Sequence, residues 1–152
     1  MPQKFGGLPR LGLVGAFAIA LCANGLAQER GAPLYQRLGG YDVIAAVTDD
    51  FLGRMRADPR FSRFAGGRSL DSRTRARQLT VDLLCQLAGG PCTYIGRPMQ
   101  SAHAGLAITA TDWDALMQHV AASVDQRKVP AKEREEFLAL FAKLKMDIVE
   151  GP

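Results

Sequence analysis

The two histidines of the chain are its first candidates for chemistry, because imidazole binds metal ions and transfers protons near neutral pH. His103 lies in the segment GRPMQSAHAGLAIT, residues 96–109, with small residues on both sides and Met99 about one helical turn before it. His119 lies in a segment with helical spacing of apolar residues. Taken alone, a single histidine is more often a surface or core residue than a metal ligand, so the role of His103 depends on the fold around it.

Cys85 and Cys92 are the second candidate group. Their C-x6-C spacing does not match a zinc site, and the second pair of ligands that such a site needs is missing. In an exported protein, two cysteines this close in sequence can form a disulfide. Two buried free thiols are the alternative, and the sequence does not choose between them.

Apolar residues recur at steps of three and four along most of the chain, which predicts helices. The predicted helices cover residues 33–38, 41–57, 79–87, 99–104, 113–124 and 130–148. Thr111 and Asp114 have the spacing of a capping box near the start of the fifth helix. No segment alternates as a half-buried strand does, so the predicted fold class is all-α, with a single domain.

Residues 1–27 have the pattern of a secretory signal peptide. Two basic residues precede an apolar run over residues 11–21, and small residues stand at Gly25 and Ala27. The run is short for a membrane span, which needs roughly 20 apolar residues. We therefore expect cleavage before Gln28, a short tether over residues 28–32, no stable membrane span, and a periplasmic or secreted protein.

The charge of the chain argues against nucleic acid as a partner. Removing the two basic residues of the leader from the 19 basic and 15 acidic residues of the chain leaves a net charge of +2. No basic cluster is interleaved with aromatic residues, as in many nucleic-acid-binding surfaces. We expect no nucleic-acid partner.

Two segments resemble group I truncated haemoglobins. The first is PLYQRLGGYDVIAAVTDDFLGRMRADPRF, residues 33–61, and the second is LAGGPCTYIGRPMQSAHAGLAIT, residues 87–109. In the second, a glycine pair and proline are followed by tyrosine, glycine, methionine and histidine at the family's spacing. The resemblance covers roughly residues 33 to 149. It implies a shortened globin fold over residues 33–152, in which a two-over-two helical sandwich encloses a haem.

The resemblance implies that His103 is the proximal ligand of the haem iron, and it gives His119 no role. Small residues beside His103 would let the flat macrocycle approach the short helix. The other positions that the resemblance places around the cofactor are Phe51, Leu52, Phe64, Ala76, Thr80, Leu84, Tyr94, Arg97, Met99 and Ile108. Arg75 and Arg77 are, with Arg97, candidates to meet the haem propionates, because arginine suits carboxylates.

The distal positions depart from the family's pattern. Many members have a tyrosine where this chain has Leu52, and glutamines where it has Ala76 and Thr80. Those family residues donate hydrogen bonds to the bound ligand, and the polarity of the distal pocket governs what a haem protein does with oxygen. An apolar pocket with Thr80 as its one hydroxyl is therefore expected, and it disfavours nitric-oxide dioxygenation.

The resemblance implies an exported haem globin that reversibly binds a diatomic gas, oxygen, carbon monoxide or nitric oxide, at iron held by His103. A haem redox enzyme acting on nitric oxide, nitrite or peroxide is the alternative, and it would need an electron donor that the sequence does not identify. A helical interaction domain without haem is a third hypothesis. The missing distal donors favour gas binding over a dedicated enzyme.

Overall fold

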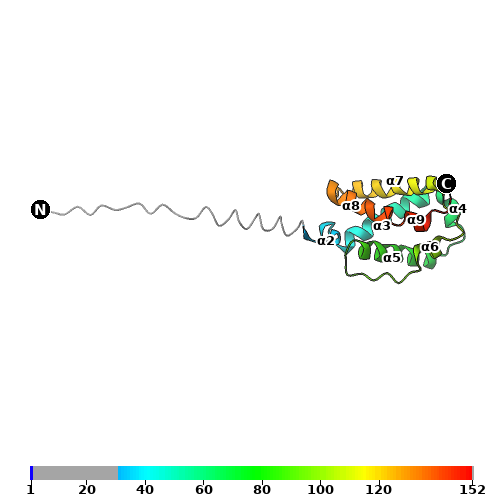
Figure 1. The fold of residues 1–152 in the computed structure, drawn as a ribbon, viewed down its shortest axis with the longest axis horizontal. Helices are drawn as coiled ribbons and strands as arrows, with labels where there is room; N and C mark the ends of the chain where they lie inside the picture. The colour runs from blue at the N-terminus through cyan, green and yellow to red at the C-terminus, as the bar shows by residue number, and fades with distance from the viewer. Residues whose placement is uncertain (2–30, 152) are drawn as a thin grey trace. The chain divides into compact units, whose positions relative to one another are not determined.

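The structure, a computed structural model, describes Met1 and residues 31–151 (Figure 1). The predicted signal peptide, apart from Met1, and residues 28–30 of the tether lie outside the described residues. The chain divides into two units, Met1–Ala32 and Pro33–Pro152, and the second carries the helices discussed below. Among the described residues, no helix combines the length and apolar character that crossing a membrane requires.

The second unit is helical, and the prediction of an all-α fold is confirmed. Within residues 33–151 the only bridge of β type is an isolated parallel one between Thr109 and Gly151. The elements are α2 (Leu34–Arg37), α3 (Tyr41–Ala57), η1 (Pro59–Phe61), α4 (Ser62–Ala65), α5 (Leu70–Leu87), α6 (Met99–His103), α7 (Ala110–Gln126), α8 (Ala131–Ala142) and α9 (Lys145–Ile148).

Helix α3 is the centre of the packing, since it contacts both α5 and α7, and α7 in turn contacts α8 (Figure 1). The pairs α3–α5 and α7–α8 form the two layers. They are joined by an aromatic contact in which Phe51 of α3 meets Phe141 of α8 edge-on, with 5.9 Å between ring centroids. Val81 of α5 and Val120 of α7 are fully buried in the same core.

Helix α5 begins nine residues before the leucine spacing that predicts it. The Ser69 hydroxyl caps the helix by accepting a hydrogen bond of 3.1 Å from the backbone N–H of Ser72, and Asp71 lies in the first turn, where its charge favours the helix dipole. Residues 70–75 are exposed and mostly polar. An apolar stripe cannot reveal this part of the helix, because it buries nothing.

Helix α7 begins earlier than expected, and the predicted capping box of Thr111 and Asp114 is wrong. The box is formed by Thr109 and Asp112: the Asp112 N–H donates to the Thr109 hydroxyl at 3.1 Å, and the Thr109 N–H donates to the Asp112 carboxylate at 2.9 Å. The segment ITATDWD holds the Thr-x-x-Asp spacing twice, so spacing alone cannot choose. A further bond from Arg63 to Asp112 favours the first.

The predicted final helix is broken at residues 143–144. Helix α8 ends at Ala142, and α9 then packs against α6. The turn is closed by the Leu144 N–H, which donates to the Phe141 carbonyl at 2.8 Å. The change of direction buries Ile148, and it brings the end of the chain beside the segment that carries His103.

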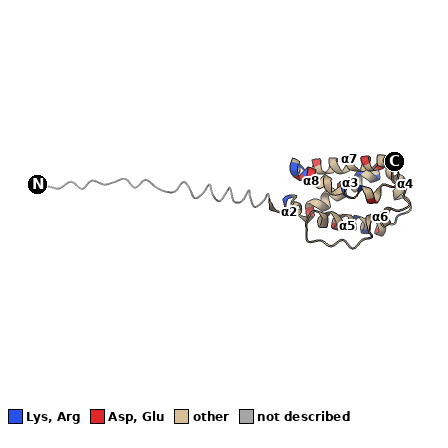
Figure 2. Cartoon of the chain, viewed as in Figure 1, with Lys and Arg blue, Asp and Glu red and all other residues tan. Residues whose placement is uncertain are grey.

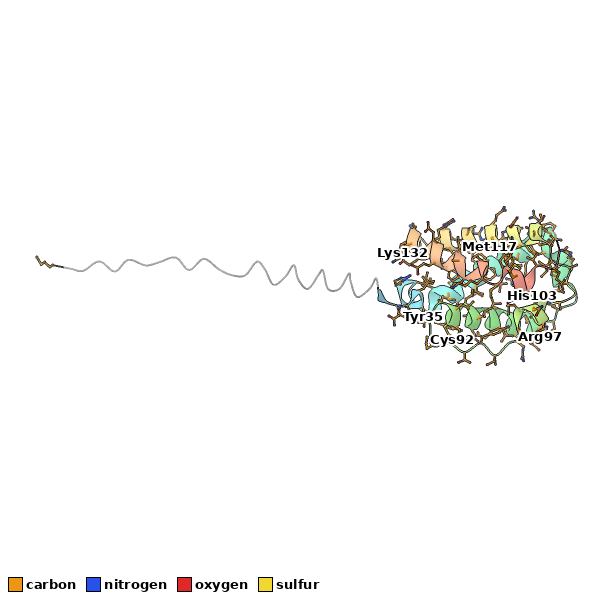
Figure 3. All side chains as sticks on the ribbon, in the orientation of Figure 1. Tyr35, Cys92, Arg97, His103, Met117 and Lys132 are labelled. Atoms are coloured by element: carbon orange, nitrogen blue, oxygen red, sulfur yellow. A yellow bond between two sulfur atoms is a disulfide. The ribbon has the colours of Figure 1, made fainter. Side chains whose placement is uncertain are left out.

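A disulfide joins Cys85 of α5 to Cys92 in the following loop, with 5.8 Å between the Cα atoms; Cys92 is labelled in Figure 3. The reversal between them is tight. A Cβ at Gly90 would lie 2.5 Å from the Tyr35 ring and 2.7 Å from the Cys85 sulfur, and Gly89 has a φ of +80°. The structure therefore decides between the two readings that the sequence leaves open.

Breaking this bridge should weaken the fold. Cys85→Ala combined with Cys92→Ala is expected to lower the free energy of unfolding by about 2 kcal/mol, because a 15-residue loop gives about 3 kcal/mol and this loop is shorter. Urea unfolding of oxidised wild type and the double variant measures the difference. Two free thiols in denatured, unreduced protein lacking residues 1–27 would show that the bridge does not form.

Candidate functional site

A cavity opens between helices α3, α5, α6 and α7. It has two adjoining lobes of about 340 and 620 Å³, within the range of roughly 300–1,000 Å³ for ligand and cofactor sites. The residues that line both lobes are Leu52, Met55, Arg68, Ala76, Thr80, His103, Leu106, Trp113, Leu116 and Ile148. Most of them are apolar, so the space suits a large apolar molecule.

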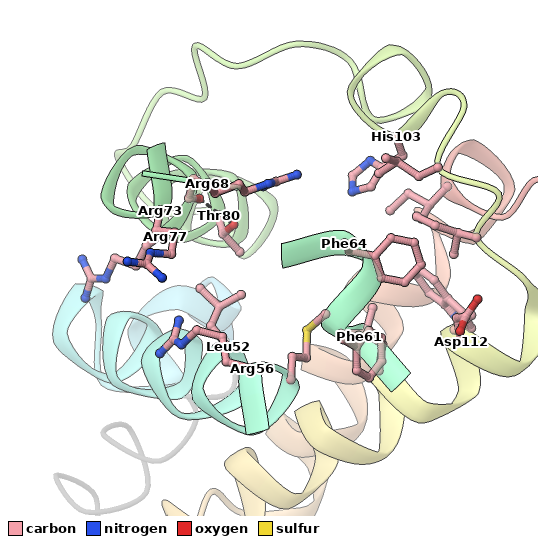
Figure 4. A pocket seen from close by; sticks show the side chains of 17 residues that line it. Leu52, Arg56, Phe61, Phe64, Arg68, Arg73, Arg77, Thr80, His103 and Asp112 are labelled. Atoms are coloured by element: carbon pink, nitrogen blue, oxygen red, sulfur yellow. Dashed lines mark hydrogen bonds between the residues drawn. The ribbon is translucent and has the colours of Figure 1, made fainter. Parts of the chain in front are cut away.

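His103 ends α6, and its ring points into this cavity (Figure 4). Its Nδ1 lies 2.9 Å from the backbone carbonyl of Met99, one turn earlier. A carbonyl oxygen only accepts hydrogen bonds, so Nδ1 carries the proton and Nε2 keeps its lone pair. A histidine oriented in this way is prepared to bind a metal ion through Nε2.

The loop after His103 is fixed by the last described residues. The Glu150 carboxylate accepts hydrogen bonds from the backbone N–H groups of Gly105, at 2.7 Å, and Ala107, at 2.6 Å. The Glu150 N–H in turn donates to the Ile108 carbonyl at 2.9 Å. Gly105 has a φ of +78°, a conformation that favours glycine. Glu150 therefore holds the turn that ends the histidine helix.

Arg63 ties the corner before α5 to the same loop. Its guanidinium donates to the Leu106 carbonyl at 3.4 Å, to the Ala107 carbonyl at 3.3 Å and to the carboxylate of Asp112. The pKa of Asp112 is lowered, first by the hydrogen bond from the Thr109 N–H and also by the Thr109 hydroxyl and Arg63. The carboxylate is thereby kept ionised.

The wall opposite His103 offers little to a polar ligand at the predicted distal positions. Leu52 and Thr80 lie across the cavity from the His103 ring (Figure 4). The Thr80 hydroxyl donates to the Ala76 carbonyl at 2.8 Å within α5. Its proton is therefore used by the helix backbone and is not directed at the cavity.

The structure brings every predicted site residue to the wall of this cavity. These residues are Phe51, Leu52, Phe64, Ala76, Thr80, Leu84, Tyr94, Arg97, Met99, His103 and Ile108. The Tyr94 hydroxyl donates to the Arg97 carbonyl at 2.7 Å, and burial raises the Tyr94 pKa. Their roles toward a cofactor stay predictions, because the cavity walls alone do not assign them.

Sequence reasoning did not place several residues of the cavity. Trp113, Leu116 and Ile148 belong to apolar stripes that predict core packing, and nothing in a stripe distinguishes a core from a ligand cavity. Arg77, a candidate for a propionate, donates to both carboxylate oxygens of Asp49, at 2.8 and 2.7 Å. That pairing lowers the Asp49 pKa and commits Arg77 to a partner within the chain.

His119 has a structural partner and does not line the cavity. Its Nε2 lies 3.0 Å from the carboxylate of Asp58, and its ring lies 5.8 Å from that of Phe61, centroid to centroid. The pKa of Asp58 is lowered, first by the hydrogen bond from the Arg60 N–H and then by His119. This histidine holds α7 to the corner that follows α3.

The bacterial-like globin family matches residues 33–150 of the chain. The group 1 truncated haemoglobin GlbN of Mycolicibacterium paratuberculosis is 31% identical over 120 residues, which cover 79% of this chain and 86% of that protein. The chain belongs to the truncated haemoglobins. The group 1 truncated haemoglobin GlbN of a Nostoc species is 30% identical over 112 residues, 74% of this chain and 92% of that protein.

Solved truncated haemoglobins share the fold. The Fe(III) form from Tetrahymena pyriformis superimposes with a TM-score of 0.71 at 25% identity and covers 78% of this chain and 98% of its own. A 2/2 haemoglobin from a Synechococcus species, in the cyanomet state with covalently attached haem, has a TM-score of 0.70 at 22% identity, with the same coverage of the two chains. The predicted two-over-two globin fold is thus confirmed, as is haem as the family's cofactor.

The residues of this truncated haemoglobin fit a haem. His103 presents an imidazole whose Nδ1 is already hydrogen-bonded, as ligating histidines require. Apolar side chains from α3, α5 and α7 face the space beside it. Arg75 and Arg97 line the larger lobe, where a guanidinium can pair with a propionate.

Replacing His103 should release the cofactor. His103→Ala is expected to bind haem weakly or lose it during purification, whereas His119→Ala, which removes the contact with Asp58, should keep it. The His103→Ala protein should also be less stable, because a cofactor that binds the native state adds stability. Absorption spectra of the ferric, ferrous and carbon monoxide forms provide the measurement. An unchanged ferrous spectrum in His103→Ala would rule out His103 as the ligand.

Proposed function

We propose that this truncated haemoglobin binds haem through Nε2 of His103 and holds a diatomic gas, oxygen, carbon monoxide or nitric oxide, reversibly on the opposite side. The observation that carries the proposal is the His103 ring, pointed into the cavity with its Nδ1 hydrogen-bonded to the Met99 carbonyl. That bond fixes the tautomer and the ring orientation, so that Nε2 can serve as a ligand.

The haem supplies the iron to which the gas binds, and the chain supplies the surroundings. Leu52 lies across the cavity from His103 (Figure 4) and Ala76 also lines it, so neither of these two positions offers a hydrogen-bond donor. Glu150 and Arg63 fix the loop after His103 through hydrogen bonds to its backbone. The imidazole therefore keeps its position when a gas enters or leaves.

The distal wall should respond to an added donor. Bound dioxygen carries partial negative charge, and a buried hydrogen bond to a charged group contributes about 1.5–3 kcal/mol, roughly ten- to hundredfold in an equilibrium constant. Leu52→Tyr is therefore expected to slow oxygen release by that order and carbon monoxide release much less. Thr80→Val should change oxygen release less than about twofold, because the hydroxyl already donates within the helix. Stopped-flow dissociation rates measure both.

Two results would speak against this account. A ferrous wild-type protein that takes up neither gas contradicts the proposed function. A large acceleration of oxygen release in Thr80→Val contradicts the assignment of the Thr80 hydroxyl to the Ala76 carbonyl.

We also propose that the protein works outside the cytoplasm, in the periplasm or as a secreted protein. Two features support this. Residues 1–27 have the pattern of a secretory signal, and Cys85 and Cys92 are disulfide-bonded. Structural disulfides persist mainly in oxidising compartments. A globin in such a compartment meets gases and small anions before they reach the cytoplasm.

Intact mass spectrometry of the mature protein from the producing cell decides the location. Loss of residues 1–27, with Gln28 at the new N-terminus, is expected, together with a mass that is lower than that of the reduced chain by two hydrogen atoms, because the Cys85–Cys92 disulfide has formed. Recovery of the full-length chain from the cytoplasmic fraction would contradict export.

A further inference from the structure

Arginines are the main charged residues of the cavity wall. Six arginines line its two lobes, Arg56, Arg68, Arg73, Arg75, Arg77 and Arg97. The one acidic residue among the lining residues that the structure describes is Asp112, which is already bonded to Arg63. Elsewhere along the helices, acidic and basic residues are interspersed (Figure 2). The excess of positive charge is therefore local to the cavity.

Arg68 is exposed to solvent on one side, but among the labelled arginines it is the one whose side chain extends toward His103 (Figure 4). It follows the Gly66-Gly67 turn, just before the Ser69 cap of α5, and its guanidinium extends into the cavity toward His103 (Figure 4). Among the described residues, no side chain or backbone group makes a hydrogen bond or an ion pair with Arg68. The labelled side chains of Arg73 and Arg77, in contrast, point away from His103.

The cavity has more positive charge than a haem can neutralise. Arg77 is paired with Asp49 and Arg73 points away from His103 (Figure 4), which leaves four of the lining arginines. A haem brings two propionates, which can pair with two of these arginines. Arg75 and Arg97 line only the larger lobe. A cleft lined by charge of one sign concentrates ions of the opposite sign. The remaining guanidinium groups therefore favour an anion inside the cavity.

We propose that the distal side of this truncated haemoglobin binds a small monovalent anion at ferric iron, with the Arg68 guanidinium as its hydrogen-bond donor. The inference rests on the proposed function, since it needs the iron that His103 would hold. Leu52 and Ala76 offer no donor, and the Thr80 proton is used within α5. Arg68 thus takes the place of the polar side chains that the predicted distal positions lack. Charge-assisted hydrogen bonds to anions are stronger than neutral ones.

Fluoride is a suitable probe, because it is a small anion that binds ferric haem and accepts strong hydrogen bonds. Titration of the ferric protein, followed by absorption at constant pH and ionic strength, gives its dissociation constant. Arg68→Gln removes the charge and the guanidinium donor and is expected to weaken fluoride binding about tenfold. Carbon monoxide binding to the ferrous protein should change much less than fluoride binding, because this ligand is neutral.

Arg60→Gln is the matched control. Arg60 is exposed and lies outside the cavity, and its guanidinium makes no hydrogen bond or ion pair with any described residue. The substitution removes the same unit of charge from the protein, so it reports the effect of net charge alone. Fluoride affinity in Arg60→Gln should stay within about twofold of wild type.

Three alternative results would contradict the proposal, and each has a different meaning. Equal fluoride affinity in Arg68→Gln and Arg60→Gln, with haem and carbon monoxide binding intact, removes the anion site and leaves the gas-binding function standing. If Arg68→Gln transfers its haem faster to a haem acceptor while fluoride affinity is unchanged, Arg68 serves a propionate instead. A wild-type protein that binds no haem overturns both the anion site and the function on which it rests.

Discussion

The site depends on the contacts that hold one short helix, α6, in place. Helix α6 has five residues, and a helix of that length has too few internal hydrogen bonds to be stable in isolation. The His103 ring is hydrogen-bonded to the carbonyl of Met99, the first residue of α6, and Glu150 and Arg63 hold the loop that follows the helix. Helix α9 packs against α6 as well. The orientation of the His103 ring is therefore maintained by contacts from distant parts of the chain.

The same arrangement explains the placement of the surrounding elements. Arg63 belongs to α4, so the corner that presents Phe64 to the cavity is fastened to the loop that follows His103. The break between α8 and α9 turns the chain toward α6 and places Ile148 on the cavity wall. Both sides of the cavity are thus connected through the loop over residues 104–109. A change in that loop would therefore affect the position of His103 and that of α4 together.

Local pattern was sufficient where a helix buries an apolar face. The spacing along residues 41–57 predicts α3 with the bounds that the structure shows, and the motif around His103 predicts which residue enters the cavity. The sequence pattern did not predict helix ends that depend on polar contacts. The first turns of α5 bury nothing, and the choice between Thr109 and Thr111 as a cap depends on Arg63, which is distant in sequence.

The arginines show a further limit of sequence reasoning. Arg68 stands in a glycine-rich loop, where its spacing carries no period and its direction depends on the backbone turn before it. Arg77 carries a charge that could bind a propionate, but it is hydrogen-bonded to Asp49, which lies 28 residues earlier. Which basic side chains remain free for a ligand is a property of the whole set of pairs. It can be read only when the partners are in place.

The position of Glu150 has a consequence for the order in which the protein matures. The carboxylate that fixes the turn after His103 is 45 residues further along the chain than Gly105, and Ile148 beside it completes the cavity wall. During synthesis, these residues emerge after the helices that carry the rest of the site. A nascent chain that lacks residues 148–150 therefore has neither the contacts that hold the loop after His103 nor the complete wall of the cavity.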